Sequence, residues 1–281
     1  MSAAVGSQSR GVGLLRWVAL TIAALLFVGV PLWLVVINSF KTQPEAAELG
    51  LTLPQAWHAL ENYSAVITDS DYLRGLVNSL IVTIASVALL FAIAAPAAWA
   101  IARSRARWMR VIYVLAIIGV VLPPAVVPMV FLMRGVGLQG TLPALILFTV
   151  GMRVSLVVFL LAGFARGLPR ELEEAAFVDG ATRRRTFFSI VLPLMRPILW
   201  SAFIITVVLV WNDFYGPMFL LTGDNATLPL GLYRLSSGIA QATAWNSVFA
   251  HVVLVSLPLI LVYVVIQRRV VEGVTAGAVK G

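Results

Sequence analysis

The sequence predicts an all-α membrane protein with six transmembrane helices. Of its 281 residues, 60% are hydrophobic and only 11% are charged, whereas soluble domains average about 25% charged residues. Six apolar stretches approach the length of about 20 residues that a helix needs to cross a hydrocarbon core of roughly 30 Å. A chain of this composition cannot bury its apolar surface in one soluble core, so the bilayer must cover it.

Composition also excludes several kinds of site. The chain has no cysteine, so it has no disulfide, thiolate nucleophile or thiolate metal site. Its two histidines, His58 and His251, are far apart in the sequence, and we expect no metal site. The net charge of +8 would suit nucleic acid, but in a membrane protein basic residues gather on the cytoplasmic side near anionic lipid. We therefore expect contact with membrane lipid and no nucleic-acid partner.

The first transmembrane helix is predicted over 17–37, after a polar cytoplasmic segment, 1–16, that we expect to be loosely ordered. The apolar run is too long for a signal-peptide core, and no small-residue cleavage pattern follows it, so the span should remain uncleaved. Pro31 should bend this helix. The polar loop 38–75 then leads to the second span.

The second and third spans are predicted over 76–102 and 111–133. The third contains prolines at positions 123, 124 and 128, which remove backbone donors, so neighbouring helices must satisfy the freed carbonyls. This pattern is typical of a kinked, packed helix and equally of a bend that lines a path through the membrane.

The remaining spans are predicted over 142–164, 198–221 and 248–266. Arg153 lies near the middle of the fourth, and Trp211-Asn212-Asp213 lies about half-way along the fifth. The six spans make up one transmembrane domain, 17–266, followed by a cytoplasmic tail, 267–281.

The distribution of basic residues supports this topology. One side of the predicted membrane holds both termini and the loops after the second and fourth spans. It carries 15 of the 20 Lys and Arg residues: Arg10, Arg16, four arginines within 103–110, six within 166–196, Arg268, Arg269 and Lys280. The positive-inside rule then places both termini in the cytoplasm.

The segment 171–197 is a polar, arginine-rich stretch between two apolar spans. Acidic residues follow Pro169 and suit the positive end of a helix dipole, and Gly180 suits a helix C-terminus because it can adopt a positive φ. Three arginines, 183–185, begin a second helix that Leu192-Pro193 should end. These features predict a cytoplasmic helix–turn–helix, although a solvated loop would share the composition.

The spacing within this segment resembles the EAA loop of ABC importer permeases, here 165–197. Glu-Ala-Ala at 174–176 is followed after three residues by Gly180, after nine more by Ile190, and after one more by Leu-Pro at 192–193. In that family the loop forms a coupling helix that docks on a cytoplasmic ATPase. The resemblance assigns this role to Glu174, Ala175, Ala176, Asp179, Gly180, Leu192 and Pro193.

Two further stretches resemble the carbohydrate branch of this family, the maltose-type or MalG-like permeases. They are Leu-Glu-Asn-Tyr at 60–63 and the tail, with Glu272, Gly277 and Lys280. In that family the tail reaches between the two ATPase subunits. The glycine-rich tail has little intrinsic helix propensity, so we expect it not to order without a partner.

The resemblance implies a MetI-like permease fold in a multi-pass protein of a bacterial or archaeal plasma membrane. It further implies a heterodimer with a homologous second permease, two ATPase subunits that hold ATP and Mg, and an extracytoplasmic solute-binding protein. The chain itself should bind no cofactor and should not be an enzyme. Its lysines, Lys41 and Lys280, stand in no phosphate-binding G-x-x-x-x-G-K-[ST] run. An intramembrane enzyme would need a nucleophile–base pair or metal ligands, and no histidine or cysteine accompanies Asp213 and Arg153.

The expected function is therefore that of a permease subunit that imports a sugar or related solute. The alternative is the same machinery with a glycerol phosphate, a glycerophosphodiester or another polar solute as cargo. Ionisable and polar groups within spans are costly and mark candidate pathways. We select Trp211, Asn212, Asp213, Arg153 and Asn78. The alternatives are that Asn212 and Asp213 tie helices together, or that Asp213 pairs with Arg153.

Overall fold

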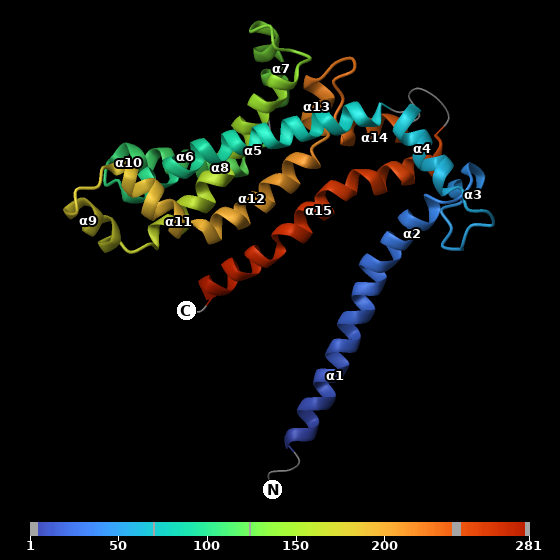
Figure 1. Cartoon of the computed structure of the whole chain (residues 1–281), viewed down its shortest axis with the longest axis horizontal. Coiled ribbons are helices and arrows are strands. Elements are labelled where there is room, and N and C mark those ends of the chain that lie inside the picture. Colours follow the sequence, from blue (N-terminus) through green and yellow to red (C-terminus); the bar gives the residue numbers. More distant parts are fainter. Residues whose placement is uncertain (1–4, 70, 124, 238–242, 279–281) are drawn as a thin grey trace. The chain divides into compact units, whose positions relative to one another are not determined.

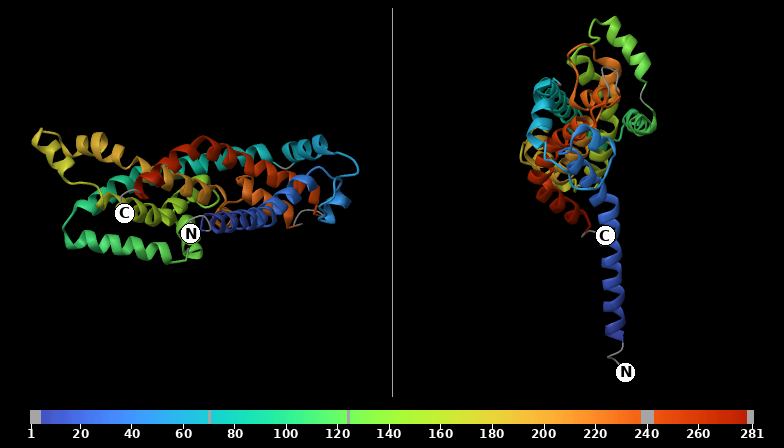
Figure 2. Two further views of the ribbon diagram at one scale, coloured as in Figure 1. Left: turned by 90° about the horizontal axis from the view of Figure 1, so that it is seen from below. Right: turned by 90° about the vertical axis from the view of Figure 1, so that its right-hand side faces the viewer.

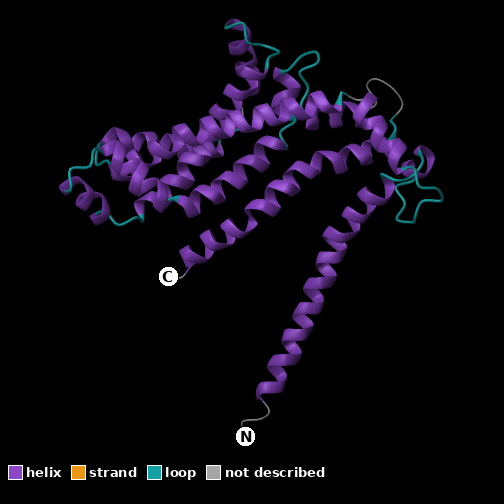
Figure 3. Ribbon diagram, in the orientation of Figure 1, coloured by secondary structure: helices purple, strands orange, loops and turns teal. Residues whose placement is uncertain are grey.

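The computed structural model describes residues 5–69, 71–123, 125–237 and 243–278 (Figure 1). Its regular elements within these ranges are helices, and the one β-bridge found there joins Gly140 to Leu221 (Figure 3). The chain divides into two compact units, Met1–Asp71 with Arg234–Ser256, and Tyr72–Tyr233 with Leu257–Gly281. Four helices are long and apolar enough to span a membrane, and six spans result if each of two bent helix pairs counts as one.

The first span belongs to a helix that begins much earlier than predicted. α1 (Val5–Ala24), the π-helical turn η1 (Leu25–Gly29) and α2 (Val30–Asn38) follow one another without a loop. The expectation that 1–16 is loosely ordered is therefore wrong for residues 5–16. Once the apolar span has nucleated a helix, each added residue gains a hydrogen bond without a new nucleation cost.

At Pro31, where a bend is predicted, the helix is continuous and contains the π-turn η1 just before the proline. A proline at this position cannot donate to the carbonyl of Phe27. The backbone N–H of Val30 bonds to the carbonyl of Leu25, which adds one residue to the turn.

The first unit also contains two shorter helices, α3 (Gln43–Ala47) and α4 (Ala59–Asp69). Asn62 of α4 makes several of the polar contacts that hold this unit together. Its buried amide donates to the carbonyls of Ser39 and Lys41, both at 2.9 Å, and its Oδ1 accepts from Asn246 Nδ2 at 2.7 Å. Asn246 lies at the start of α15 (Trp245–Ala278). The Leu-Glu-Asn-Tyr stretch therefore joins α4 to the end of α2 and the start of α15.

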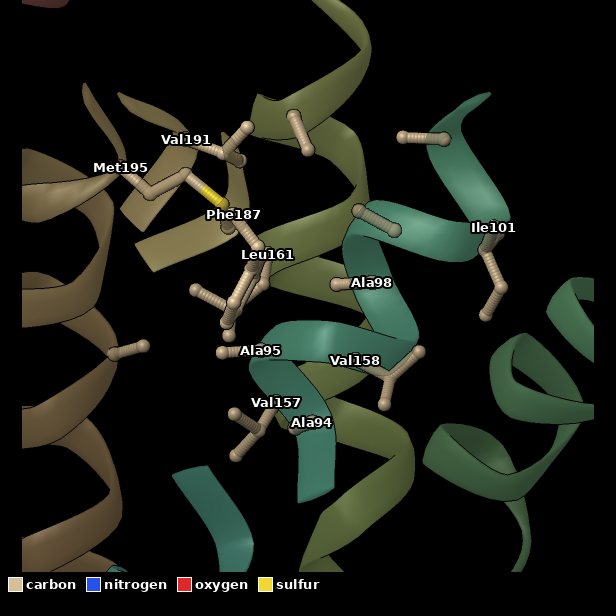
Figure 4. Close-up of a cluster of buried hydrophobic side chains, with 14 residues drawn as sticks. Ala94, Ala95, Ala98, Ile101, Val157, Val158, Leu161, Phe187, Val191 and Met195 are labelled. Carbon is tan, nitrogen blue, oxygen red and sulfur yellow. The ribbon is translucent and has the colours of Figure 1, made fainter. Parts of the chain in front are cut away.

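The second unit is built around α5 (Tyr72–Arg103) and α8 (Leu142–Arg166), which run side by side (Figures 1 and 2). Ala94 and Ala98 of α5 are buried against Val157 and Leu161 of α8 (Figure 4). Small residues allow two helix backbones to approach closely in a membrane protein. α6 (Arg107–Val121) and α12 (Arg196–Trp211) pack against this pair.

The predicted third span is two helices instead of one kinked helix. α6 ends at Val121 and α7 (Val126–Gly135) begins after a break, with a bend of 110° between them. Leu122 is extended (φ −66°, ψ 135°), as expected for a residue before a proline. Two adjacent prolines therefore break the span instead of bending it.

The predicted fifth span is also interrupted. α12 ends at Trp211 and the short α13 (Tyr215–Leu220) follows after a break. Before the predicted span, α12 meets the helical segment Arg183–Leu194 at an angle of 74°. Asn212 and Asp213 thus lie at a helix end, and the prediction that they lie half-way along a continuous helix is wrong. An additional helix, α14 (Leu228–Ser236), lies between α13 and α15.

The sixth span ends close to its predicted end at 266, because its apolar part covers Trp245–Gln267, but the helix α15 continues beyond it to Ala278. The expectation that the tail does not order is wrong as far as this residue. Each helical glycine costs about 1 kcal/mol relative to alanine, and the long apolar helix that precedes the tail outweighs this cost.

Candidate functional site

The EAA loop folds as the sequence predicts, into two short helices joined at a glycine. α9 (Glu171–Val178) ends with Gly180 at φ +80°, and the N–H groups of Gly180 and Ala181 bond to the carbonyls of Phe177 and Ala176. This pair of bonds is a Schellman motif, which needs a residue with positive φ at this position. Thr182 then caps α10 (Arg183–Thr186) by accepting the N–H of Arg185 at 3.3 Å.

A buried ion pair fixes α9 to the end of α5. Arg103 donates from Nε to Glu173 Oε1 at 2.7 Å, and its Nη2 lies 2.7 Å from the same oxygen as an ion pair. Nη2 also donates to the carbonyl of Leu168 at 3.0 Å. Trp99 Nε1 donates to the second carboxylate oxygen of Glu173 at 2.9 Å. The sequence analysis missed this contact, since no local spacing links residues 70 positions apart.

The predicted coupling residues divide between two faces of the loop. Glu174, Ala175, Asp179 and Gly180 are exposed, whereas Ala176 is buried against the protein. Two apolar neighbours on the outer face, Phe177 at 41% and Val178 at 88% exposure, are uncovered by this chain. The outer face is thus a compact apolar surface edged by acidic groups.

The other predicted coupling residues lie elsewhere. Leu192 and Pro193 are half-buried in α11 (Leu192–Leu194), directly after the π-turn η2 (Phe187–Val191). Glu272 and Gly277 lie in the last turns of α15, and Lys280 lies outside the described residues.

A separate polar cavity of about 320 Å³ lies where α12 gives way to α13. Its charged lining residues are Arg153 of α8 and Asp213, and its other polar side chains include Thr149 and Tyr215. The predicted alternative of an Arg153–Asp213 ion pair is not seen, because no salt bridge within the described ranges joins them. Asp213 Oδ1 instead accepts the N–H groups of Tyr215 at 3.1 Å and Gly216 at 3.2 Å, and so caps α13.

The other three predicted pathway residues do not line this cavity. Trp211 is buried beside it, and Asn212 is exposed and donates to the carbonyl of Val208 at 2.9 Å. Asn78 is buried and donates to the carbonyl of Ala226 at 3.0 Å, which ties α5 to the loop before α14. The cavity therefore brings together two of the five predicted residues, and it adds Thr149 and Tyr215.

The described residues contain no group of three or more His, Cys, Asp or Glu side chains that could hold a metal ion.

Comparisons with known proteins point to the same family of transport proteins as the EAA loop does. Residues 92–276 match the family described as binding-protein-dependent transport system inner membrane component. The chain is 34% identical to the diacetylchitobiose uptake system permease protein NgcG of Streptomyces coelicolor, over 92% of this chain and 86% of that protein. It is 29% identical to AmyC of Thermoanaerobacterium thermosulfurigenes, a probable starch degradation products transport system permease protein, over 92% of this chain and 94% of that protein.

A solved structure shares the fold. A chain of a bacterial ABC transporter involved in the import of the acidic polysaccharide alginate superimposes with a TM-score of 0.77. The match covers 93% of this chain and 97% of that chain, at 22% sequence identity.

Proposed function

Because the chain belongs to the family of binding-protein-dependent transport system inner membrane components, we propose that it is a permease subunit of an ABC importer for a sugar or oligosaccharide. The observation that carries the proposal is the EAA loop. All of its fixed positions are present, it is anchored to α5 by the Arg103–Glu173 pair, and its outer apolar face is uncovered. Exposed apolar patches of this kind mark protein interaction sites.

The proposed partners follow from this surface and the family. The outer face of α9 docks on one of two ATPase subunits, which hold ATP and Mg. A homologous second permease completes the membrane part, and an extracytoplasmic solute-binding protein delivers the cargo. Both termini and the EAA loop lie in the cytoplasm, as the charge distribution favours.

The Arg153–Asp213 cavity is the proposed contribution of this chain to the substrate path. Its volume of about 320 Å³ is at the small end of the roughly 300–1,000 Å³ typical of ligand pockets. A guanidinium, a carboxylate and two hydroxyls supply donors and acceptors for sugar hydroxyl groups. The named cargoes of the two relatives are saccharides, which favours a sugar over a glycerol phosphate or glycerophosphodiester.

Purification and reconstitution test this proposal. The tagged chain should copurify with an ATPase and a second permease. The complex in proteoliposomes should take up a radiolabelled saccharide only with ATP and the cognate binding protein, whose ligand a thermal-shift screen identifies. A chain that purifies without an ATPase, or uptake that does not depend on ATP, would refute it.

A further inference from the structure

The second unit contains an apolar groove of about 1,040 Å³ that the proposed transport function does not use. Three helical segments form it: the C-terminal half of α5, the α10–η2–α11 stretch of the EAA loop, and the first turns of α12. Its volume is at the upper end of the range for small-molecule sites.

Aromatic and aliphatic side chains form the walls of the groove. On α5, Ala92, Pro96 and Trp99 line it, at the spacing of one helix face. Phe203 of α12 packs edge-on against Phe91 of α5, with ring centroids 6.2 Å apart. Such walls suit a long apolar ligand.

One end of the groove is strongly basic. Arg183 and Arg184 line it from α10, and Arg196 lines it from the first residue of α12. No acidic residue lines the groove, and none of these three arginines forms an ion pair within the part of the chain that is described. Phe203 lies seven residues beyond Arg196, about 10 Å along the helix, so charge and apolar surface are separated along the groove.

We propose that this groove binds an anionic phospholipid, with the headgroup phosphate at the three arginines and an acyl chain along Pro96, Trp99 and Phe203. The proposal rests on the proposed orientation, which puts these arginines at the cytoplasmic leaflet. That leaflet is rich in anionic lipid, and basic pockets between transmembrane helices at this level bind anionic headgroups. Because the ligand touches α5, α12 and the EAA loop together, it also stabilises the position of the loop.

Lipid retention by the purified protein tests the proposal. The full chain, with any subunits that copurify, is extracted in mild detergent, supplied with phosphatidylglycerol or phosphatidylcholine, and examined by native mass spectrometry. Wild type should retain phosphatidylglycerol selectively. Replacing Arg183, Arg184 and Arg196 together by Gln should weaken retention by about a hundredfold, since each basic group near an anionic surface contributes about a fivefold gain. Arg185→Gln is the matched control, because Arg185 is exposed on the same helix and does not line the groove.

A second variant tests the apolar half of the site. Ala92 is exposed and lines the groove, so Ala92→Trp should fill it without disturbing the core. Retention should fall with all three arginines present, and circular dichroism should confirm that the variant is folded. Equal retention by wild type and the triple variant would overturn the proposal. Competition by inorganic phosphate together with normal retention by Ala92→Trp would show a simple anion site instead.

Two other outcomes are also informative. If Ala92→Trp separates the two permeases while bound lipid is unchanged, the groove holds a helix of the partner and the lipid proposal is wrong. The lipid measurement needs neither ATP nor sugar. Selective lipid retention without saccharide uptake would therefore refute the transport proposal and support the lipid site.

Discussion

Glu173 positions the EAA loop through one buried carboxylate. It is 7% exposed, and both of its oxygens accept hydrogen bonds from α5, from Arg103 and from Trp99. The neighbouring Glu174 is exposed and free to meet a partner. Successive residues of an α-helix point about 100° apart, so Glu173 faces the protein while Glu174 faces outward. One glutamate is therefore structural and the other is available for docking.

Replacing Arg103 tests this anchor. Arg103→Gln leaves the Glu173 carboxylate buried beside a neutral group, and loss of one partner of a buried pair costs about 3–5 kcal/mol. We expect faster hydrogen–deuterium exchange over 168–178 and a lower thermal midpoint. Arg105→Gln, an exposed arginine nearby, should change stability by about 0.5 kcal/mol or less. Unchanged exchange in Arg103→Gln would show that the loop is held by other contacts.

Glu45, which lies outside the membrane spans, should make the stability of the protein depend on pH. A hydrogen bond from the N–H of Gln55 lowers its pKa below the ordinary value of 4.5, desolvation opposes this shift, and bonds from Thr42 add to it. A carboxylate with a lowered folded-state pKa stabilises above the unfolded value and loses that contribution as pH falls. The difference in thermal midpoint between wild type and Glu45→Gln should be widest near neutral pH and narrow below about pH 4.5. A difference independent of pH would contradict this assignment.

At the scale of elements, helix ends determine where the candidate sites lie. The sequence was sufficient to predict the helix end at Gly180, because its signal is local: a glycine after an apolar and acidic helix. The end of α12 at Trp211 was missed, because apolar residues flank Asn212 and Asp213 on both sides and no glycine or proline separates Trp211 from Asp213. Only the capping bonds of Asp213 reveal the start of α13.

The effect of a substitution at Gly180 should depend on whether the new residue can adopt the positive φ of this position. A Cβ at this position would meet no atom within 4 Å, so any penalty comes from φ +80° and not from a clash. Gly180→Val should leave the chain in the membrane and abolish substrate-stimulated ATP hydrolysis by the reconstituted complex. Gly180→Asn should retain most of it, because asparagine tolerates the left-handed region. Equal activity of both variants would indicate that the turn is not needed for coupling.

Asp213 combines a capping role with a place in the cavity. Asp213→Asn keeps an oxygen for the N–H groups of Tyr215 and Gly216, so the complex should assemble normally while saccharide uptake falls severalfold. Asp213→Ala loses the cap as well, at about 1 kcal/mol, and should also lower the thermal midpoint. Asp224→Asn, which alters an exposed carboxylate paired with Arg74, is the control. Normal uptake by Asp213→Asn would remove this residue from the substrate path.

At the scale of the whole molecule, the sequence was sufficient to predict the helical class, the number of apolar spans and the EAA loop. The predicted number of six is reached when each of two bent helix pairs counts as one span, and the breaks in these pairs lie near the prolines at 123–124 and 197. Whether a proline kinks or breaks a helix depends on its packing neighbours, which a single sequence does not specify. The Arg103–Glu173 anchor and the composition of the polar cavity were missed for a related reason, since both join residues that are distant in the chain.

The topology can be measured directly. Reporter enzymes fused at Gly50 and at Gly180 should report opposite sides of the membrane, with Gly180 in the cytoplasm. A fusion at Gly137, in the turn after α7, should report the same side as Gly50 if α6 and α7 together make one span. Gly50 and Gly180 on one side would refute the six-span topology.

Both π-turns end two residues before a proline: η1 before Pro31 and η2 before Pro193. In η2 the N–H of Leu192 bonds to the carbonyl of Phe187. Each turn holds one residue more than an α-helical turn would, and one residue corresponds to about 100° of helical phase. Deleting Ser189 from η2 would therefore rotate Arg183 and Arg184 by about 100° relative to Pro193 without changing any other side chain. The extra residue of η2 therefore determines which side of the helix Arg183 and Arg184 occupy, and so places them near Arg196. Pro193 prevents this segment from forming a regular α-helix in which the extra residue would be lost.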